Sequence, residues 1–149
     1  MGTPTDSAEQ VMYNGRMIIV SKGTRRGDVA GDTIFAFEGA TRFLIRPLRV
    51  QFSTPLGRPL AAITAVDGTY SLTGSALEAR GPVTILSDTA RRTLTTSSVR
   101  YDPVTNEIAG DSAFTAIAGT RKLSGVGFTT DPGLFNIRCR ERCSGSLGR

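Results

Sequence analysis

The sequence of 149 residues contains neither histidine nor tryptophan, and only 7% of its residues are aromatic. Without histidine, the chain lacks the usual general base, the commonest metal ligand and the side chain that titrates near neutral pH. A serine nucleophile would need a lysine as its base, and only Lys22 and Lys122 exist. We therefore predict that the protein is not an enzyme and has no catalytic residues, no metal site and no cofactor.

Cysteine is also scarce, because Cys139 and Cys143 are the only two. Two thiols in a chain without histidine cannot complete a tetrahedral zinc site. They can close a small disulfide loop in an oxidising compartment or remain free thiols, and both alternatives stay open. Both cysteines lie in the basic tail, residues 138–149, which we expect to be mostly disordered. With a flexible lead-in over residues 1–9, the tail bounds a single predicted domain, residues 10–137.

Long apolar runs are missing, so no segment of about 18 residues is suited to cross a membrane as a helix. The first residues do not resemble a signal peptide either. The net charge of +5 suits an anionic partner, such as nucleic acid or phosphate-bearing lipid headgroups, or only a basic surface. We expect the aromatic side chains to face inward, and a nucleic-acid partner is therefore not predicted.

What the sequence does contain is glycine, serine and threonine between short apolar segments, with no 12-residue window that has a helical period. In residues 48–52, Leu48, Val50 and Phe52 alternate with polar residues, which is typical of a strand with one wet face. Residues 54–59 hold two prolines and a glycine and predict an exposed hairpin tip. Asn14-Gly15 predicts a hairpin turn or, equally, a bulge or a bend within one strand. We expect strands over residues 120–131 and 134–137 as well.

An apolar repeat organises the middle of the chain. It is carried by three sets of residues with internal steps of seven and six: Phe37, Leu44, Val50; Tyr70, Leu77, Val83; and Tyr101, Ile108, Phe114. The second and third sets are 31 residues apart. A fixed spacing of this kind indicates stacked units, and here the unit is a β-hairpin. We therefore predict an all-β, antiparallel fold of ten or more short strands.

Stacked hairpins can form a sealed sandwich or a long folded sheet that keeps a channel between its two faces. The few aromatic residues favour a loosely filled interior that accepts a ligand. The predicted inner residues are Phe37, Leu48, Val50, Phe52, Tyr70, Leu72, Leu77, Val83, Ile85, Val99, Tyr101, Ile108 and Phe114.

Several segments resemble the LptC family and, more broadly, its LptA and OstA relatives. They are EQVMY (residues 9–13), DGTY (67–70), LEARGPV (77–83), VRYDP (99–103), NEI (106–108), LSGVGF (123–128) and DP (131–132). LptC proteins are inner-membrane-anchored, periplasmic components of the lipopolysaccharide export machine. The resemblance covers most of residues 9–137. It implies an open-ended, twisted, V-shaped β-jellyroll (a β-taco), with lipid A acyl chains held against the inner residues.

The resemblance also implies that the sheet edges dock partners by β-augmentation. The N-terminal edge would meet the inner-membrane lipopolysaccharide ABC transporter, and the C-terminal edge would meet an LptA-like bridge protein. The expected docking residues are Val11, Tyr13, Ile18 and Val20 at the first edge, and Leu123, Gly125, Gly127 and Phe128 at the second. We expect a periplasmic location and an N-terminal membrane anchor in the full-length protein. The alternative function is a β-rich structural or adhesive protein with a sealed core and no lipid ligand.

Overall fold

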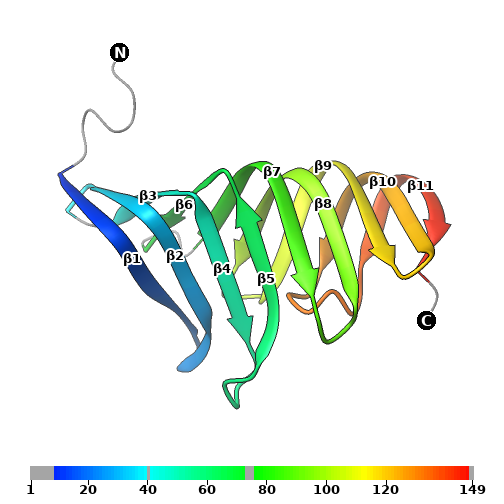
Figure 1. The fold of residues 1–149 in the computed structure, drawn as a ribbon, viewed down its shortest axis with the longest axis horizontal. Coiled ribbons are helices and arrows are strands. Elements are labelled where there is room, and N and C mark those ends of the chain that lie inside the picture. Colours follow the sequence, from blue (N-terminus) through cyan, green and yellow to red (C-terminus); the bar gives the residue numbers. More distant parts are fainter. Residues whose placement is uncertain (1–8, 40, 73–75, 148–149) are drawn as a thin grey trace.

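The computed structural model describes residues 9–39, 41–72 and 76–147, and every regular element within these ranges is a β-strand (Figure 1). The strands are β1 (Gln10–Ser21), β2 (Thr24–Phe37), β3 (Arg42–Arg46), β4 (Leu48–Ser53), β5 (Pro59–Ala65), β6 (Asp67–Ser71), β7 (Ala76–Ser87), β8 (Arg92–Asp102), β9 (Glu107–Ala118), β10 (Arg121–Thr130) and β11 (Arg138–Ser146). All pairings between the described strands are antiparallel, so the predicted fold class is confirmed. The described residues include no helix that could span a membrane.

The strands form one sheet, in which neighbours in the chain are neighbours in space once β3 with β4, and β5 with β6, are each counted as one strand. β3 and β4 are two halves of one bent strand that meet at the cis Arg46–Pro47 peptide. β5 and β6 are likewise two halves, separated by Val66. The first bent strand pairs with the second in a single register, from Arg42 opposite Ser71 to Leu48 opposite Ala65. The sheet is therefore a meander of long strands, as the hairpin repeat predicts.

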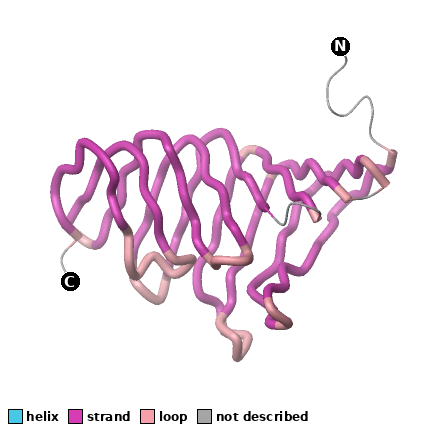
Figure 2. The backbone as a smooth tube through the Cα atoms, turned by 180° about the vertical axis from the view of Figure 1, so that it is seen from behind, coloured by secondary structure: helices cyan, strands magenta, loops and turns pink. Residues whose placement is uncertain are grey.

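Each long strand bends near its middle, and the bends fall in a row along the sheet. In β7 and β10 they coincide with Gly81 and Gly127, whose φ angles of 89° and 78° suit glycine. The pairing register shifts at both places, which is the mark of a β-bulge. We call the half of the sheet with β4 and β5 the front arm, and the half with β3 and β6 the back arm. Figures 1 and 2 show the two arms folded over each other as a twisted V.

The side of the V opposite the bends is formed by connections between strands, and we call this margin the mouth. The front arm contributes residues 54–58 and 88–91, and the back arm contributes residues 103–106 and 131–137. These connections lie along the lower margin of Figure 1. The hairpin tip predicted over residues 54–59 is thus confirmed, with Pro59 already in β5.

Three local expectations are settled by the structure. Asn14, with a φ angle of 55°, lies inside β1, so the Asn14-Gly15 pair makes a bend and not a hairpin turn. The expected strand over residues 134–137 is wrong, because this segment is a loop. Of the expected flexible lead-in, only Glu9 is described, and its carboxylate accepts a hydrogen bond from the Gly39 amide at 2.7 Å.

The basic tail is ordered, contrary to the prediction, because residues 138–146 form β11. This strand pairs with β10 from Thr129 opposite Arg138 to Lys122 opposite Ser146. The correction also moves the C-terminal edge. Leu123, Gly125, Gly127 and Phe128 lie in β10, between β9 and β11, so they are not edge residues.

Candidate functional site

The predicted inner residues face the space between the arms, with two exceptions. Phe37 is buried at the end of β2, but its strand partner is Arg42, whose guanidinium lies 5.1 Å from the centroid of the Phe37 ring. Ala36 is the residue of this strand end that shares the inner face with Phe43, so the assignment of Phe37 to the interior is wrong. Phe37, Leu48, Val50, Phe52, Tyr70, Leu77, Val83, Ile85, Val99, Tyr101, Ile108 and Phe114 are all buried. Leu72 is 51% exposed and follows the last residue of β6, so its assignment to the interior is wrong. That the buried residues contact a lipid stays a prediction.

Two apolar rows cross the strands, one on each arm. On the back arm, pairing joins Phe43 to Tyr70, Tyr70 to Leu77, Leu77 to Tyr101 and Tyr101 to Ile108. On the front arm, it joins Val29 to Val50, Val50 to Ile63, Ile63 to Ile85 and Ile85 to Leu94. The 31-residue repeat therefore marks the passage of the chain from one hairpin to the next.

Three buried residues of the front-arm row, Val29, Ile63 and Leu94, are not among the predicted inner residues. Residues 59–65 alternate between more and less buried positions, which is the strand period of two. That signal was weak in the sequence because alanine occupies three of these seven positions.

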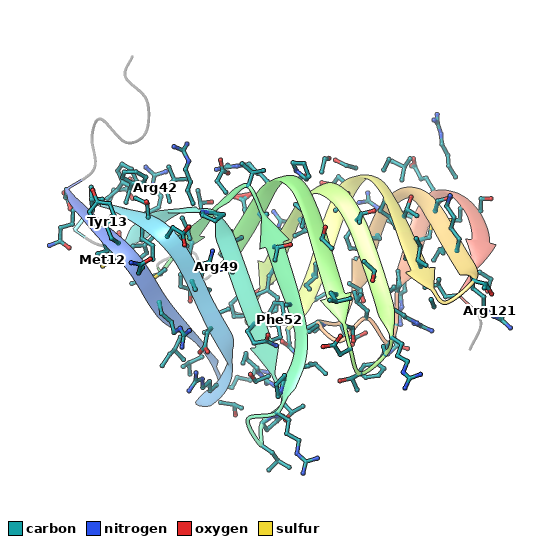
Figure 3. The ribbon with its side chains drawn as sticks, in the orientation of Figure 1. Met12, Tyr13, Arg42, Arg49, Phe52 and Arg121 are labelled. Carbon is teal, nitrogen blue, oxygen red and sulfur yellow. A yellow bond between two sulfur atoms is a disulfide. The ribbon has the colours of Figure 1, made fainter. Side chains whose placement is uncertain are left out.

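The interior is filled by side chains and is not the loosely filled channel that the composition suggested. Phe52 of the front arm and Tyr101 of the back arm meet edge to face, with ring centroids 4.8 Å apart. Figure 3 shows Phe52 further along β4 than Arg49, toward the mouth. The two arms are thus in contact through these aromatic rings. A ligand that enters between the arms must break this contact.

A loop crosses the mouth near its C-terminal end. Leu134, in the connection between β10 and β11, is fully buried and adopts a φ angle of 60°. Arg92, at the start of β8, donates hydrogen bonds from Nη1 to the carbonyl oxygens of Leu134 and Phe135, at 2.9 and 3.0 Å. Asp131 accepts three backbone N–H bonds from within the loop. Residues 131–137 therefore form a strap that Arg92 ties to the front arm.

An open hollow of about 560 Å³ lies beside this strap. Its lining comes from both arms and from the end of the chain: Arg92, Leu123, Phe135, Asn136, Ile137, Arg138, Gly145, Ser146 and Leu147. Because the strap residues and β11 both contribute, any movement of the strap reshapes this hollow.

A second, smaller hollow of about 140 Å³ opens at the middle of the mouth. It is lined by Arg26, Phe52, Ser53, Thr54, Pro55 and Leu60 of the front arm, with Asn106 and Pro132 from the back arm. Beside it, the Tyr101 hydroxyl donates to Oδ1 of Asn106 at 2.7 Å. Burial raises the pKa of Tyr101 to about 12, although the Arg26 charge acts in the opposite direction.

The N-terminal edge of the sheet is β1, which pairs with β2 alone among the described strands. Val11, Tyr13, Ile18 and Val20 of this strand are exposed, Tyr13 to 75%. Tyr13 and its neighbour Met12 lie at the free end of the sheet in Figure 3. The predicted residues thus form an apolar strip on an edge strand, and their docking role stays a prediction.

The C-terminal edge is β11, and a Cys139–Cys143 disulfide links two points of this single strand. The strand bulges between them, because residues 142 and 143 together oppose the single residue Gly125 of β10. Most of β11 is exposed, and Arg138, Arg140 and Arg142 make it strongly basic. The two edges therefore differ in chemistry, one apolar and one cationic.

Among the described residues, no group of three or more His, Cys, Asp or Glu side chains is arranged to hold a metal ion. The six ion pairs found there all lie at exposed or partly exposed positions and join arginines to carboxylates. Such pairs contribute little to stability.

Comparison with known proteins gives a match at the level of structure. No protein-family model matches the sequence, and no curated protein sequence matches it either. Among solved structures, the fold is similar to that of LptH, the LptA-homologous periplasmic component of the conserved lipopolysaccharide transport device of Pseudomonas aeruginosa. The TM-score is 0.61 at 12% sequence identity, over 98% of this chain and 100% of that one. The chain therefore has the β-jellyroll fold of that protein along almost its whole length.

Proposed function

We propose that this protein is a non-enzymatic lipopolysaccharide carrier in an export bridge, binding the lipid's acyl chains between its two arms. The observation that carries the proposal is the architecture of the interior. Two continuous apolar rows face each other, one on each arm, and between them the arms meet through the contact of Phe52 with Tyr101. The similarity of the fold to a lipopolysaccharide transport component supports the same function.

The filled interior fits a carrier if the guest replaces contacts that the arms make with each other. The Phe52–Tyr101 contact and the buried Leu134 are apolar, and so is an acyl chain. Burying one methylene group is worth about 0.8 kcal/mol, so a chain of many methylenes can offset the loss of these contacts. Opening the mouth is then the step that binding must drive.

Within the bridge, we propose that the protein is periplasmic and anchored to the inner membrane, in the position of LptC. The apolar edge at β1 would receive the inner-membrane ABC transporter, and the corrected C-terminal edge, β11, would receive an LptA-like bridge protein. An unpaired strand edge offers backbone groups for this kind of association. The sequence resemblance supports the LptC position, whereas the structural similarity is to an LptA homologue and favours neither member.

Photo-crosslinking tests the lipid-binding interior. A photo-reactive amino acid is placed at Tyr70, Ile85 or Phe114. The matched outer positions are Glu78, on the strand next to that of Tyr70, and Leu86 and Ile117, on the strands of Ile85 and Phe114. After irradiation in cells, the adducts are probed for lipopolysaccharide. We expect adducts from inner positions only. Equal labelling from outer positions, or none from inner ones in variants with wild-type circular dichroism, contradicts the proposal.

The filled interior also favours a second function, that of a structural or adhesive surface protein with a sealed core. On that view the Phe52–Tyr101 contact is permanent and lipopolysaccharide does not change it. Solution NMR of the two rings with and without lipopolysaccharide separates the two functions, because only a carrier shows new ring environments at saturation.

A further inference from the structure

Arg26 is a positive charge at the mouth, and its side chain has no hydrogen-bond or ion-pair partner among the described residues. Its Nε atom is buried and has no hydrogen-bond acceptor, the only such buried side-chain atom among the described residues. Its side chain takes part in no ion pair of the described part of the chain. By contrast, the adjacent Arg25 is paired with Asp28 on the exposed surface. Leaving a buried N–H of a charged group without a hydrogen bond costs free energy. The Arg26 Nε–H is therefore a candidate to donate a hydrogen bond to a bound ligand.

The hollow beside Arg26 has the polar groups of an anion site and no competing charge. Its lining includes no carboxylate. Ser53 and Thr54 bring hydroxyl groups from the front arm, and Asn106 brings an amide from the back arm. Because Oδ1 of Asn106 already accepts the Tyr101 hydroxyl, the amide N–H groups are what Asn106 has left to offer. Donors from both arms thus converge on a space of about 140 Å³.

The Arg26 charge is also close to the interior. It acts on the phenol of Tyr101, whose pKa it lowers against the effect of burial. Tyr101 belongs to the apolar row of the back arm and touches Phe52. An anion held at Arg26 is therefore next to the place where an apolar chain between the arms begins.

We propose that Arg26, with Asn106, binds a phosphate monoester at the mouth, and that this phosphate belongs to the headgroup of an amphiphile whose chains lie between the arms. The proposal rests on the proposed function and adds the headgroup to it. A guanidinium presents paired N–H donors that match a phosphate, and such charge-assisted hydrogen bonds are short and strong. Both arms would hold the same phosphate, which fixes the depth at which the chains enter.

The first test compares two lipids and three proteins. Binding of lipid A and of its enzymatically dephosphorylated form is measured by calorimetry for wild type, R26Q and R25Q. We expect wild type to bind lipid A roughly tenfold or more tightly than the dephosphorylated form, as the loss of a charge-assisted hydrogen bond predicts. R26Q should bind both forms alike, and R25Q should behave as wild type. If R26Q keeps the preference for lipid A, the proposal is wrong.

Other outcomes separate this proposal from the proposed function. If wild type binds both lipids equally well, the carrier function stands and the Arg26 site is refuted. If wild type binds neither lipid, the carrier function itself fails. A titration with inorganic phosphate, followed at the Arg26 Nε–H resonance by NMR, then identifies a site for free phosphate, which overturns the headgroup assignment. Thermal unfolding of R26Q serves as the folding control, and we expect no loss of stability because the guanidinium has no hydrogen-bond or ion-pair partner in the described part of the chain.

Discussion

The sulfur of Cys139 occupies the space where a side chain at Gly125 would begin. A Cβ atom built on Gly125 would lie 2.3 Å from Cys139 Sγ and 3.4 Å from a ring carbon of Phe114. Since Phe114 is a buried inner residue, the disulfide lies on the inner side of the sheet. Cys139 packs against the margin of the core, whereas Cys143 is exposed, and Gly125 is the residue that makes room for the Cys139 sulfur.

Replacing Gly125 with alanine should therefore destabilise the oxidised protein by about 1–3 kcal/mol, as overpacking does. In a C139A/C143A background the sulfur is gone, and the cost of G125A should fall, although the Glu141 carbonyl oxygen remains 2.8 Å away. The four proteins make a double-mutant cycle, measured by denaturant unfolding. An unchanged cost without the disulfide would contradict the contact described above.

Reduction of the Cys139–Cys143 bond should loosen β11 and leave the middle of the sheet intact. The bond closes a loop of only a few residues, for which chain entropy predicts about 2 kcal/mol. We expect faster amide hydrogen exchange over residues 138–146 after reduction, with exchange in β4 and β5 unchanged as the internal control. Equal protection of β11 in both redox states would show that pairing with β10 alone maintains the strand.

Removing the Arg92 side chain should release the strap. R92A loses the two hydrogen bonds to the Leu134 and Phe135 carbonyls, so residues 131–137 should exchange amide hydrogens faster. If the strap limits access to the interior, lipid association should also become faster. R91A is the matched control, since no hydrogen bond of Arg91 to the strap is found in the described structure. Unchanged hydrogen exchange over residues 131–137 in R92A would contradict the role of Arg92 in holding the strap.

Tyr101 predicts a loss of stability at high pH. Its folded-state pKa is raised from 10.0 to about 12, mainly by burial, so the folded state keeps a proton that the unfolded chain releases above pH 10. Stability is therefore unaffected below pH 10 and falls between pH 10 and 12, by up to roughly 3 kcal/mol. The raised pKa of Tyr70 acts in the same direction.

Denaturant unfolding from pH 8 to 11 measures this effect. Y101F should flatten the dependence on pH, although it also leaves Asn106 without its hydroxyl partner and costs about 1 kcal/mol at neutral pH. Y13F, at an exposed position, should leave the pH profile as it is. A steep profile that persists in Y101F would assign the pH sensitivity to another group.

The sequence predicts the hairpin meander but not its last strand, β11. Leu77 and Ile108 repeat with the hairpin because both face the interior at the same height on the back arm. In β11 no such alternation exists, because an exposed edge strand has no buried face to impose one. Its order comes from pairing with β10 and from the disulfide, which a reading of local pattern does not reveal.

The candidate site also has a part that the sequence predicts and a part that it does not. The inner rows follow from strand period, and Leu72 was misplaced because a pattern does not show where a strand stops. Arg26 carries no sequence signal at all, since its neighbour Arg25 looks the same in the chain yet is paired at the surface. Only the arrangement of the two arms brings Asn106 to face Arg26 across the mouth.

The row of bends makes this architecture extensible. Because every long strand bends at the same height, one more hairpin would add one connection to each margin of the mouth and lengthen the interior by about 10 Å, without changing its cross-section. Length and width are thus set by different parts of the sequence: the number of hairpins fixes the first, and the distance from bend to turn fixes the second. Gain or loss of hairpins can therefore adjust the length of such a sheet to the distance that it has to span.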